Sequence, residues 1–162
     1  MGTFTVQRTV AAPAADVWAL LMHWPNHGRW VPLTRVRTTS ASAAGVGATF
    51  VGRSGLGPLS FDDPMMVTAW QPPGQSPGQS PGRCEIHKTG RVVLGDAWFT
   101  VTPLDSARCT VQWSETIQVA ALRRLPLVGR VTDLVGRLTF AAAVRAMAAE
   151  AEAAAPAGRP RR

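Results

Sequence analysis

The stretch DAWFTVTPLDSARCTVQWSETI, residues 96–117, decides how this chain is expected to fold. Two runs of alternating apolar and polar residues flank the turn-forming segment TPLDSAR, a pattern typical of an antiparallel β-hairpin. Only one register puts the apolar side chains on one face, because a shift of one residue would mix the two faces. That register pairs Val101 with Val111, Phe99 with Trp113, Ala97 with Glu115, Thr100 with Gln112 and Thr102 with Thr110.

The same alternation recurs on the N-terminal side of this hairpin and predicts a sheet of about seven strands. The predicted strands are Thr3–Val10, Leu33–Thr39, Val46–Arg53, Met65–Trp70, Arg83–Lys88, Arg91–Thr102 and Cys109–Val119. A helix is expected over Ala14–Met22, where Pro13 suits the first turn, and a short second helix over Pro25–Trp30. The chain therefore opens with a strand and two helices before the run of strands.

From Leu125 the apolar period becomes helical, so a long helix is expected up to the break at Pro156. Its first apolar stripe consists of Leu127, Val131, Leu134 and Leu138. Beyond Gly136 the apolar face moves around the helix to Phe140, Val144, Met147 and Ala151. Either the helix bends near Gly136 or a short helix precedes the main one. Both suit an element that first covers a cavity and then docks on the sheet.

Composition places the chain among single-domain globular proteins. It has 162 residues, of which 46% are hydrophobic and 17% charged, which is enough apolar material for a core. One domain is expected over residues 1–155, followed by a basic, disordered tail over residues 156–162. The formal net charge of +7 is spread along the chain, so it favours anionic surfaces in general and does not indicate a nucleic-acid partner.

No membrane span or export signal is expected. The most apolar long stretch, Leu138–Ala155, is interrupted by three charged residues, whereas a span needs about 20 apolar residues. The N-terminus alternates like a strand and lacks a charged start followed by an apolar run. The expected location is the cytoplasm, where Cys84 and Cys109 are expected to be buried thiols and not a disulfide.

Residue spacing gives no support to a metal site or to a phosphate-binding loop. His23, His27 and His87 form no ligand-spaced cluster with one another or with the cysteines, so no metal is expected. His23 and His27 are expected at the surface, or else at the mouth of a cavity, and His87 is expected to face solvent. No motif implies a cofactor.

Three segments of the sequence resemble one protein superfamily. They are TVAAPAADVWALLMHWPNHGRWVP (9–32), VTAWQPP (67–73) and the hairpin 96–117. With the element order, they resemble the START-like superfamily, also called Bet v 1-like or SRPBCC, particularly its bacterial polyketide cyclase/dehydrase-like branch. The resemblance covers residues 3–153 and implies an α+β helix-grip fold, a curved antiparallel sheet wrapped around a long C-terminal helix. Because the superfamily includes lipid carriers, quinone-binding chaperones and aromatase/cyclases, the fold does not fix the activity.

An internal cavity with a hydrophobic wall is the site that this fold implies. The expected wall residues are Trp30, Phe50, Met66, Ile86, Phe99, Trp113, Glu115, Leu134 and Leu138. Such a wall suits a hydrophobic or aromatic ligand, for example a lipid, a quinone or a polyketide-like compound. The second helix and the loop around Gly55–Asp63 are expected to move when the ligand enters.

Two alternatives stay open for the function. One is an enzyme, a polyketide aromatase/cyclase or dehydratase, in which the cavity positions a flexible chain. The absence of Tyr removes one side chain that cyclising members of the superfamily use. The other is a surface role, in which the basic exterior binds RNA, the ribosome or an anionic membrane. The sequence leaves the oligomeric state open.

Glu115 is the candidate catalytic residue, because the hairpin register places its carboxylate on the apolar face. Such a group must find a partner or stay protonated, so it could act as an acid or base, or anchor a ligand hydroxyl. The alternatives are a position at the rim or an ion pair with Arg35 or Arg37. Both arginines are expected outside the sheet if Val36 points inward.

Two further features have no assigned role. Trp98 falls on the polar face of the hairpin, where it could contact another subunit or the segment 71–83. That segment is rich in Pro, Gly and Ser and repeats GQSP in tandem, so it is expected to be a mobile excursion between two strands.

Overall fold

The computed structural model describes residues 2–74, 80–120 and 126–155, and within the last helix it describes side chains from Leu134 onward. The C-terminal tail 156–162 and the middle of the segment 71–83 therefore lie outside the described residues. No described helix is long and apolar enough to cross a membrane.

The described elements follow the predicted order. They are β1 (Gly2–Val10), α1 (Ala14–Met22), α2 (His27–Trp30), β2 (Thr34–Thr38), β3 (Thr49–Ser54), β4 (Phe61–Gln71), β5 (Gly82–Lys88), β6 (Val93–Pro103), β7 (Cys109–Val119) and α3 (Pro126–Ala154). Single 3₁₀ turns, Trp24–Asn26 and Gly57–Leu59, precede α2 and β4. The largest boundary difference is in β4, which begins at Phe61 and not at Met65. Asp63 consequently lies in a strand and not in a loop.

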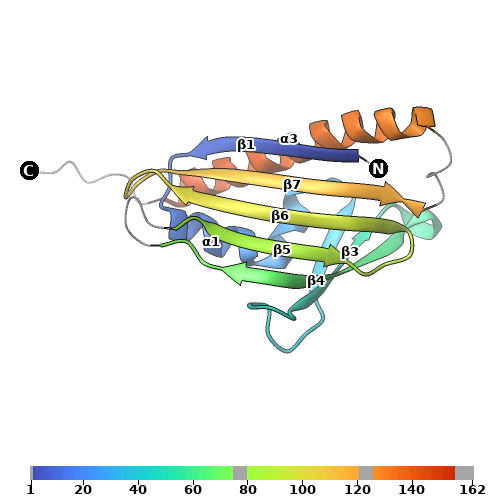
Figure 1. Cartoon of the computed structure of the whole chain (residues 1–162), viewed down its shortest axis with the longest axis horizontal. Coiled ribbons are helices and arrows are strands. Elements are labelled where there is room, and N and C mark those ends of the chain that lie inside the picture. Colours follow the sequence, from blue (N-terminus) through green and yellow to red (C-terminus); the bar gives the residue numbers. More distant parts are fainter. Residues whose placement is uncertain (1, 75–79, 121–125, 156–162) are drawn as a thin grey trace, which may run out of the picture.

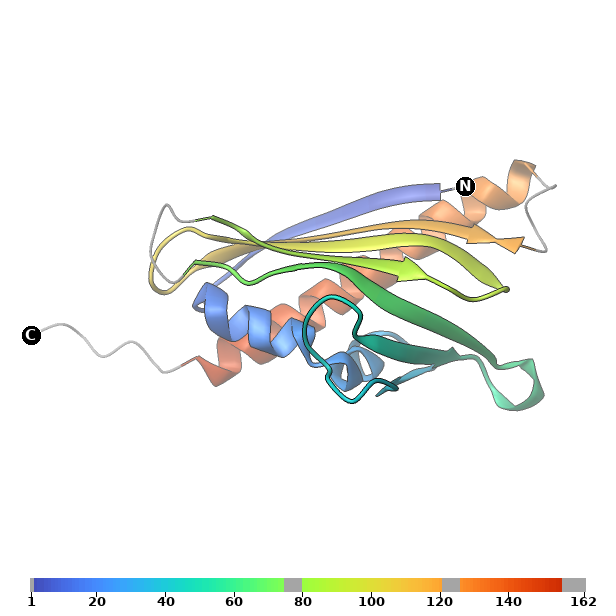
Figure 2. The same ribbon diagram turned by 60° about the horizontal axis from the view of Figure 1, so that its bottom comes forward.

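One seven-stranded sheet runs in the order β1-β7-β6-β5-β4-β3-β2, and every neighbouring pair is antiparallel. Figure 1 shows β1, β7, β6, β5 and β4 side by side. Figure 2 shows that the sheet curves and that α1, α2 and α3 lie on the same side of it. This is the α+β helix-grip fold predicted from the sequence.

The predicted register of the β6–β7 hairpin is confirmed, since all five predicted pairs occur. Phe99 and Trp113 are 1% and 4% exposed, and Glu115 is 3% exposed. Thr100 and Gln112, on the opposite face, are both only partly buried. The hairpin thus directs one carboxylate into the apolar interior.

The C-terminal half of α3 anchors the helix to the rest of the protein. Its Ala143, Val144, Met147 and Ala148 side chains are buried in the core, where each removes apolar surface from water. Farther toward the start of α3, Gly136 lies against Phe4 of β1: a Cβ at this glycine would lie 2.9 Å from Phe4 Cε1. The lack of a side chain at residue 136 therefore permits the close approach of α3 to β1.

Leu134 and Leu138, which the sequence predicts for the cavity wall, instead point outward and are 59% and 63% exposed. Since successive helical residues are about 100° apart, Leu134 and Leu138 lie about 120° and about 160° around α3 from Phe140, whose ring lines the cavity. The side chains of Leu127 and Val131, the other members of the predicted stripe, lie outside the described part of the chain.

Candidate functional site

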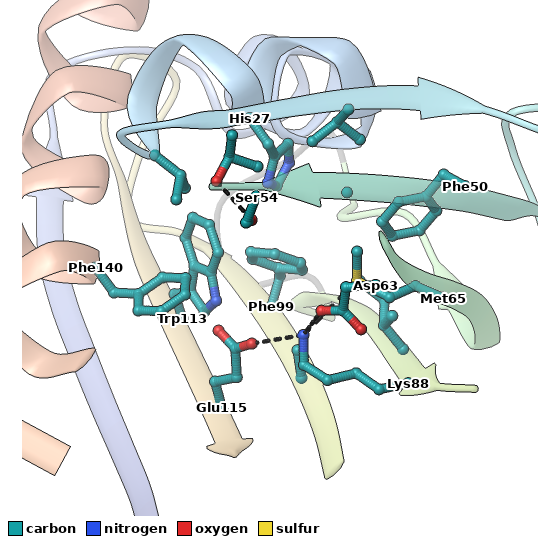
Figure 3. Close-up of a pocket in the computed structure, with 16 residues that line it drawn as sticks. His27, Phe50, Ser54, Asp63, Met65, Lys88, Phe99, Trp113, Glu115 and Phe140 are labelled. Atoms are coloured by element: carbon teal, nitrogen blue, oxygen red, sulfur yellow. Dashed lines mark hydrogen bonds and ion pairs between the residues drawn. The ribbon is translucent and has the colours of Figure 1, made fainter. Parts of the chain in front are cut away.

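A cavity of about 110 Å³, partly open to solvent, lies between the inner face of the sheet, α2 and α3. Most of its wall is apolar and is formed by aliphatic side chains and aromatic rings. The rings are those of His27, Phe50, Phe99, Trp113 and Phe140 (Figure 3). Three charged side chains from three strands, Asp63, Lys88 and Glu115, complete the wall. The cavity is therefore aromatic with one charged cluster.

Lys88 lies between the two carboxylates and forms an ion pair with each. Its Nζ donates to Asp63 Oδ2 at 2.7 Å and lies 2.9 Å from Glu115 Oε1. The same nitrogen contacts Met65 Sδ at 3.8 Å. The side chains of Lys88 and Glu115 are each 5% exposed, and that of Asp63 is 11% exposed. Because two carboxylates share one ammonium, the cluster carries surplus negative charge when both are ionised.

Three buried polar atoms of this region have no hydrogen-bond partner among the described residues: Asp63 Oδ1, Glu115 Oε2 and Trp113 Nε1. In Figure 3 the indole nitrogen of Trp113 faces the free oxygen of Glu115. A buried polar atom left without a partner costs about 1–3 kcal/mol. Trp113 and Glu115 nevertheless interact, because a hydrogen bond from Trp113 lowers the pKa of Glu115.

The charged cluster controls the protonation of its members. Burial raises the pKa of Glu115 and Asp63 adds repulsion, whereas Lys88 and a hydrogen bond from Trp113 lower it and compensate only in part. Burial alone would lower the pKa of Lys88, but the two carboxylates outweigh this effect and raise it, so the amine stays charged. A charged amine is not a nucleophile. Glu115 is thus the member placed to take up or release a proton.

Strand alternation explains why the three side chains meet. Lys88 shares the inner face of β5 with Cys84 and Ile86, and all three are buried. It is paired in the sheet with Met65 of β4, and Asp63 is the next inward residue along that strand. The charged cluster therefore forms only when the pairs β4–β5, β5–β6 and β6–β7 all have the observed registers.

His27 is 8% exposed and lines the cavity, so the expected surface position is wrong and the alternative position at the cavity is the one observed. Its Nε2 donates to the Leu21 carbonyl oxygen at 2.7 Å, which means that the neutral ring carries its proton on Nε2. Burial lowers the pKa of His27 to about 4. The ring packs edge-on against Phe99 and Trp113. The turn between α1 and α2 places the imidazole in the cavity wall, and the last turn of α1 supplies its hydrogen-bond acceptor.

Five of the nine residues predicted for the cavity wall line the cavity: Phe50, Ile86, Phe99, Trp113 and Glu115. Trp30 is buried elsewhere, where its Nε1 donates to Glu150 Oε2 of α3 at 2.9 Å. Met66 is not part of the wall, because alternation along β4 turns its neighbour Met65 inward. Leu134 and Leu138 point outward, as described above.

Sequence reasoning missed Lys88 and Asp63 as parts of the wall. A signal for Lys88 was available, because it is the only lysine in the chain and alternates in phase with Cys84 and Ile86. Asp63 had no comparable signal, since the segment FDDP looks like a turn and not like a strand. Phe140 was recognised as apolar, but the helix face that meets the cavity was not identified.

The outer face of the sheet carries the expected polar residues. Val36 lines the cavity, and Arg35 and Arg37 are exposed on the other face of β2, as predicted for this orientation. Neither arginine is therefore the partner of Glu115. His87 also faces outward, where its Nδ1 lies 2.7 Å from Asp96 Oδ1.

Both cysteines are buried and free, as predicted. Burial raises the pKa of Cys84 to about 12 and that of Cys109 to about 11, so neither thiol is a reactive nucleophile. In the described part of the chain no group of three or more His, Cys, Asp or Glu side chains has the arrangement of a metal site.

Comparison with known proteins supports the fold. No protein-family model matches the chain, and no curated protein matches it. Among solved structures, a START superfamily protein from Mycobacterium smegmatis superposes with a TM-score of 0.71 at 13% identity, over 94% of this chain and 99% of that one. The Zhui aromatase/cyclase from Streptomyces sp. R1128 gives 0.69 at 17% identity, over 95% and 98%. A protein from Thermobifida fusca gives 0.66 at 24% identity, over 93% of both chains.

These similarities identify the fold as START-like, in agreement with the resemblance found in the sequence. Proteins of this fold in the comparison include aromatase/cyclases. The identities are too low to carry over a substrate or a catalytic residue.

Proposed function

We propose that this protein binds a hydrophobic or aromatic small molecule in the cavity, with a polar group of the ligand on the charged cluster formed by Asp63, Lys88 and Glu115. The ligand would come from the range that the fold suggests, namely a lipid, a quinone or a polyketide-like compound. The observation that carries this proposal is the cavity itself, an aromatic and aliphatic wall in which Asp63, Lys88 and Glu115 form a single charged cluster.

The size of the cavity limits what can be fully enclosed. Its volume of about 110 Å³ is somewhat below the roughly 150 Å³ of an engineered protein cavity that binds benzene. A single ring therefore fits with small side-chain movements, and a larger ligand would extend through the opening. Polar groups that fix orientation in an otherwise apolar cavity are typical of small-molecule sites.

Binding can be tested with small aromatic probes and a variant that fills the cavity. Ala97 lines the cavity and is 5% exposed, so Ala97→Leu should occupy the space of a ring. Titration of the wild-type protein with phenol or toluene, followed by two-dimensional amide NMR, should shift signals of cavity residues. Ala97→Leu should abolish these shifts. Thr100→Leu, on the outer face of the same strand, should retain them.

The wild-type protein should also carry a small molecule when it is purified from its own host, and native mass spectrometry should detect the added mass. If toluene and phenol leave the cavity signals unchanged, or if Ala97→Leu responds to them as the wild type does, the cavity is not a binding site and the proposal fails.

A second candidate function is catalysis of polyketide cyclisation or dehydration, which the raised pKa of Glu115 beside Lys88 favours. Glu115 would move a proton in an enclosed site whose shape positions the substrate. If the protein is an enzyme, Glu115→Gln should lose turnover while it keeps its fold and its affinity for aromatic probes. If the protein only binds its ligand, the same variant should change the affinity alone.

A further inference from the structure

Three leucines protrude into solvent at the end of the sheet where the chain passes from β3 to β4. Leu33 is 61% exposed, Leu56 65% and Leu59 84%. They belong to one corner of the molecule, because the backbone N–H of Gly55 donates to the Leu33 carbonyl oxygen at 3.0 Å. Leu56 then precedes the 3₁₀ turn Gly57–Leu59, and Leu59 ends it. We call these three side chains the leucine tip; the hydrophobic core does not include them.

Neither the backbone nor the packing explains why residue 33 is a leucine. Its φ is +56°, in the left-handed region that favours glycine or asparagine. At 61% exposure the side chain also gains little from burial. A glycine or an asparagine would therefore suit the isolated protein better, whereas burial against a partner would give the leucine a physical reason.

Two exposed arginines lie opposite each other beside the leucine tip. Arg35 of β2 is the direct partner of Arg53 of β3 in the antiparallel pair, and like charges in opposite positions destabilise a sheet. Asp62 of β4 forms an ion pair with Arg53 at 3.2 Å. Among the described residues no carboxylate forms an ion pair with Arg35. This group of three side chains therefore carries one positive charge in excess.

The arginines and the leucine tip share one hollow on the surface. It has a volume of about 480 Å³, is partly open to solvent, and is lined by Arg35 and Arg53 together with Leu33, Leu56 and Ser60. Arg53 Nη2 donates to Ser60 Oγ at 2.8 Å, which holds this guanidinium beside the hollow. Guanidinium groups bind phosphate oxygens with strong, charge-assisted hydrogen bonds. The corner thus combines groups that bind an anion with exposed apolar side chains.

An anionic phospholipid surface offers a complement to both features in one partner. Its phosphates attract basic side chains, and the boundary between headgroups and acyl chains accepts apolar ones. A protein partner is less suited, because leucine is under-represented among the residues that dominate protein interfaces. RNA would supply phosphates for the arginines but no apolar phase for the leucines.

We propose that this corner of the protein docks on an anionic phospholipid membrane. The leucine tip enters the boundary between headgroups and acyl chains, and Arg35 and Arg53 donate to lipid phosphates. Thr34 lines both this hollow and the aromatic cavity, so docking brings the cavity close to the membrane. The docking itself goes beyond the proposed function and does not depend on it.

Co-sedimentation of the full chain with lipid vesicles tests the docking. The protein should bind vesicles of equimolar phosphatidylcholine and phosphatidylglycerol, and should bind vesicles of phosphatidylcholine alone much more weakly. Leu56→Ser and Leu59→Ser should each lower the affinity for the anionic vesicles about tenfold, because the burial of one leucine is lost. Arg35→Gln should lower it about fivefold, the contribution of one basic side chain near an anionic surface.

Leu104→Ser and Arg108→Gln are the matched controls. Leu104 is 46% exposed, the side chain of Arg108 is 60% exposed, and both residues lie in the turn between β6 and β7. Figure 1 and Figure 2 show this turn at the opposite end of the sheet from the turn between β3 and β4. Both controls should bind the anionic vesicles as the wild type does, and so should Ala97→Leu, in which the cavity is filled. Circular dichroism establishes that each variant is folded.

Several outcomes would overturn the docking proposal. One is a wild-type protein that does not bind the anionic vesicles, and another is a loss of binding in the controls as large as that in the leucine variants. Amide NMR shifts at the hollow with glycerol phosphate, without vesicle binding, would indicate a site for small phosphates only. Binding of polyuridylic RNA that Arg35→Gln weakens, without vesicle binding, would assign the surface to RNA. None of these results bears on the proposed function, which fails only if the aromatic probes do not bind the cavity.

Discussion

The buried imidazole of His27 makes the stability of this protein sensitive to mild acid. Its pKa falls from 6.5 in an unfolded chain to about 4 in the fold, because burial disfavours the charged ring. Below pH 6.5 the unfolded state therefore binds a proton that the folded state does not bind. The contribution of His27 to stability is complete above pH 6.5 and is lost as the pH falls toward 4.

The size of this loss follows from the two pKa values. One pKa unit corresponds to about 1.4 kcal/mol, so His27 should lower the free energy of unfolding by about 3 kcal/mol between pH 7 and pH 4. Other groups also titrate in this range, and the raised pKa of Glu115 acts in the opposite direction. The informative quantity is therefore the difference in the free energy of unfolding between the wild type and a variant without the imidazole, measured at each pH.

Urea denaturation of the wild type and of His27→Phe, at several pH values from 7.5 to 4, measures this difference. The variant loses the hydrogen bond to the Leu21 carbonyl oxygen and should be less stable at pH 7.5. Its disadvantage should shrink by about 3 kcal/mol on going to pH 4. Parallel pH profiles for the wild type and His27→Phe would show that the ring is not held neutral, and would refute the reasoning.

Three further substitutions test the structure at other points. Lys88→Met leaves two buried carboxylates without their cation, so it should cost about 3–5 kcal/mol, and the cost should grow from pH 5 to pH 8 in urea denaturation. Gly136→Ala should lower the melting temperature, because its Cβ would lie 2.9 Å from Phe4 Cε1 and the overpacking outweighs a helix-propensity gain of about 1 kcal/mol; an unchanged or higher melting temperature would contradict this packing. Gly95→Ala should destabilise more than either, since its φ is +131° and its Cβ would lie 1.8 Å from Thr116 O; circular dichroism that shows wild-type stability would contradict the described β6–β7 pairing.

The fold was predictable because its decisive signals are local. The hairpin 96–117 sorts its residues by polarity in one register only, and the structure has that register. The helix Ala14–Met22 was predicted with the bounds that it has. The beginning of β4 was missed because Asp62, Asp63 and Pro64 are typical of turns, whereas pairing with β3 holds them in an extended conformation.

The site was only half predictable, because it depends on contacts between elements that are distant in the sequence. Alternation alone places Phe99, Trp113 and Glu115 on the inner face. The identity of the partner of Glu115 depends on the registers that connect β7 through β6 to β5. His27 shows the same limit: a histidine beside a proline-containing turn looks exposed, and only the docking of α2 against the sheet buries it. Tertiary packing decides such positions, and no local pattern encodes it.

The fold alone does not explain why the interior contains the charged cluster, because such a group is expected to lower the stability of the protein. Replacement of a buried ion-pair group by apolar residues of similar volume is often neutral or stabilising, by about 1–4 kcal/mol. Here the group also leaves Asp63 Oδ1 without a partner among the described residues, so a purely apolar wall of Met and Leu would be expected to give a more stable protein. The aromatic rings around the cluster already supply the hydrophobic burial that holds α3 and the sheet together. The proposed function supplies a physical reason for the cluster, because a ligand in the cavity would meet the polar part of its wall there.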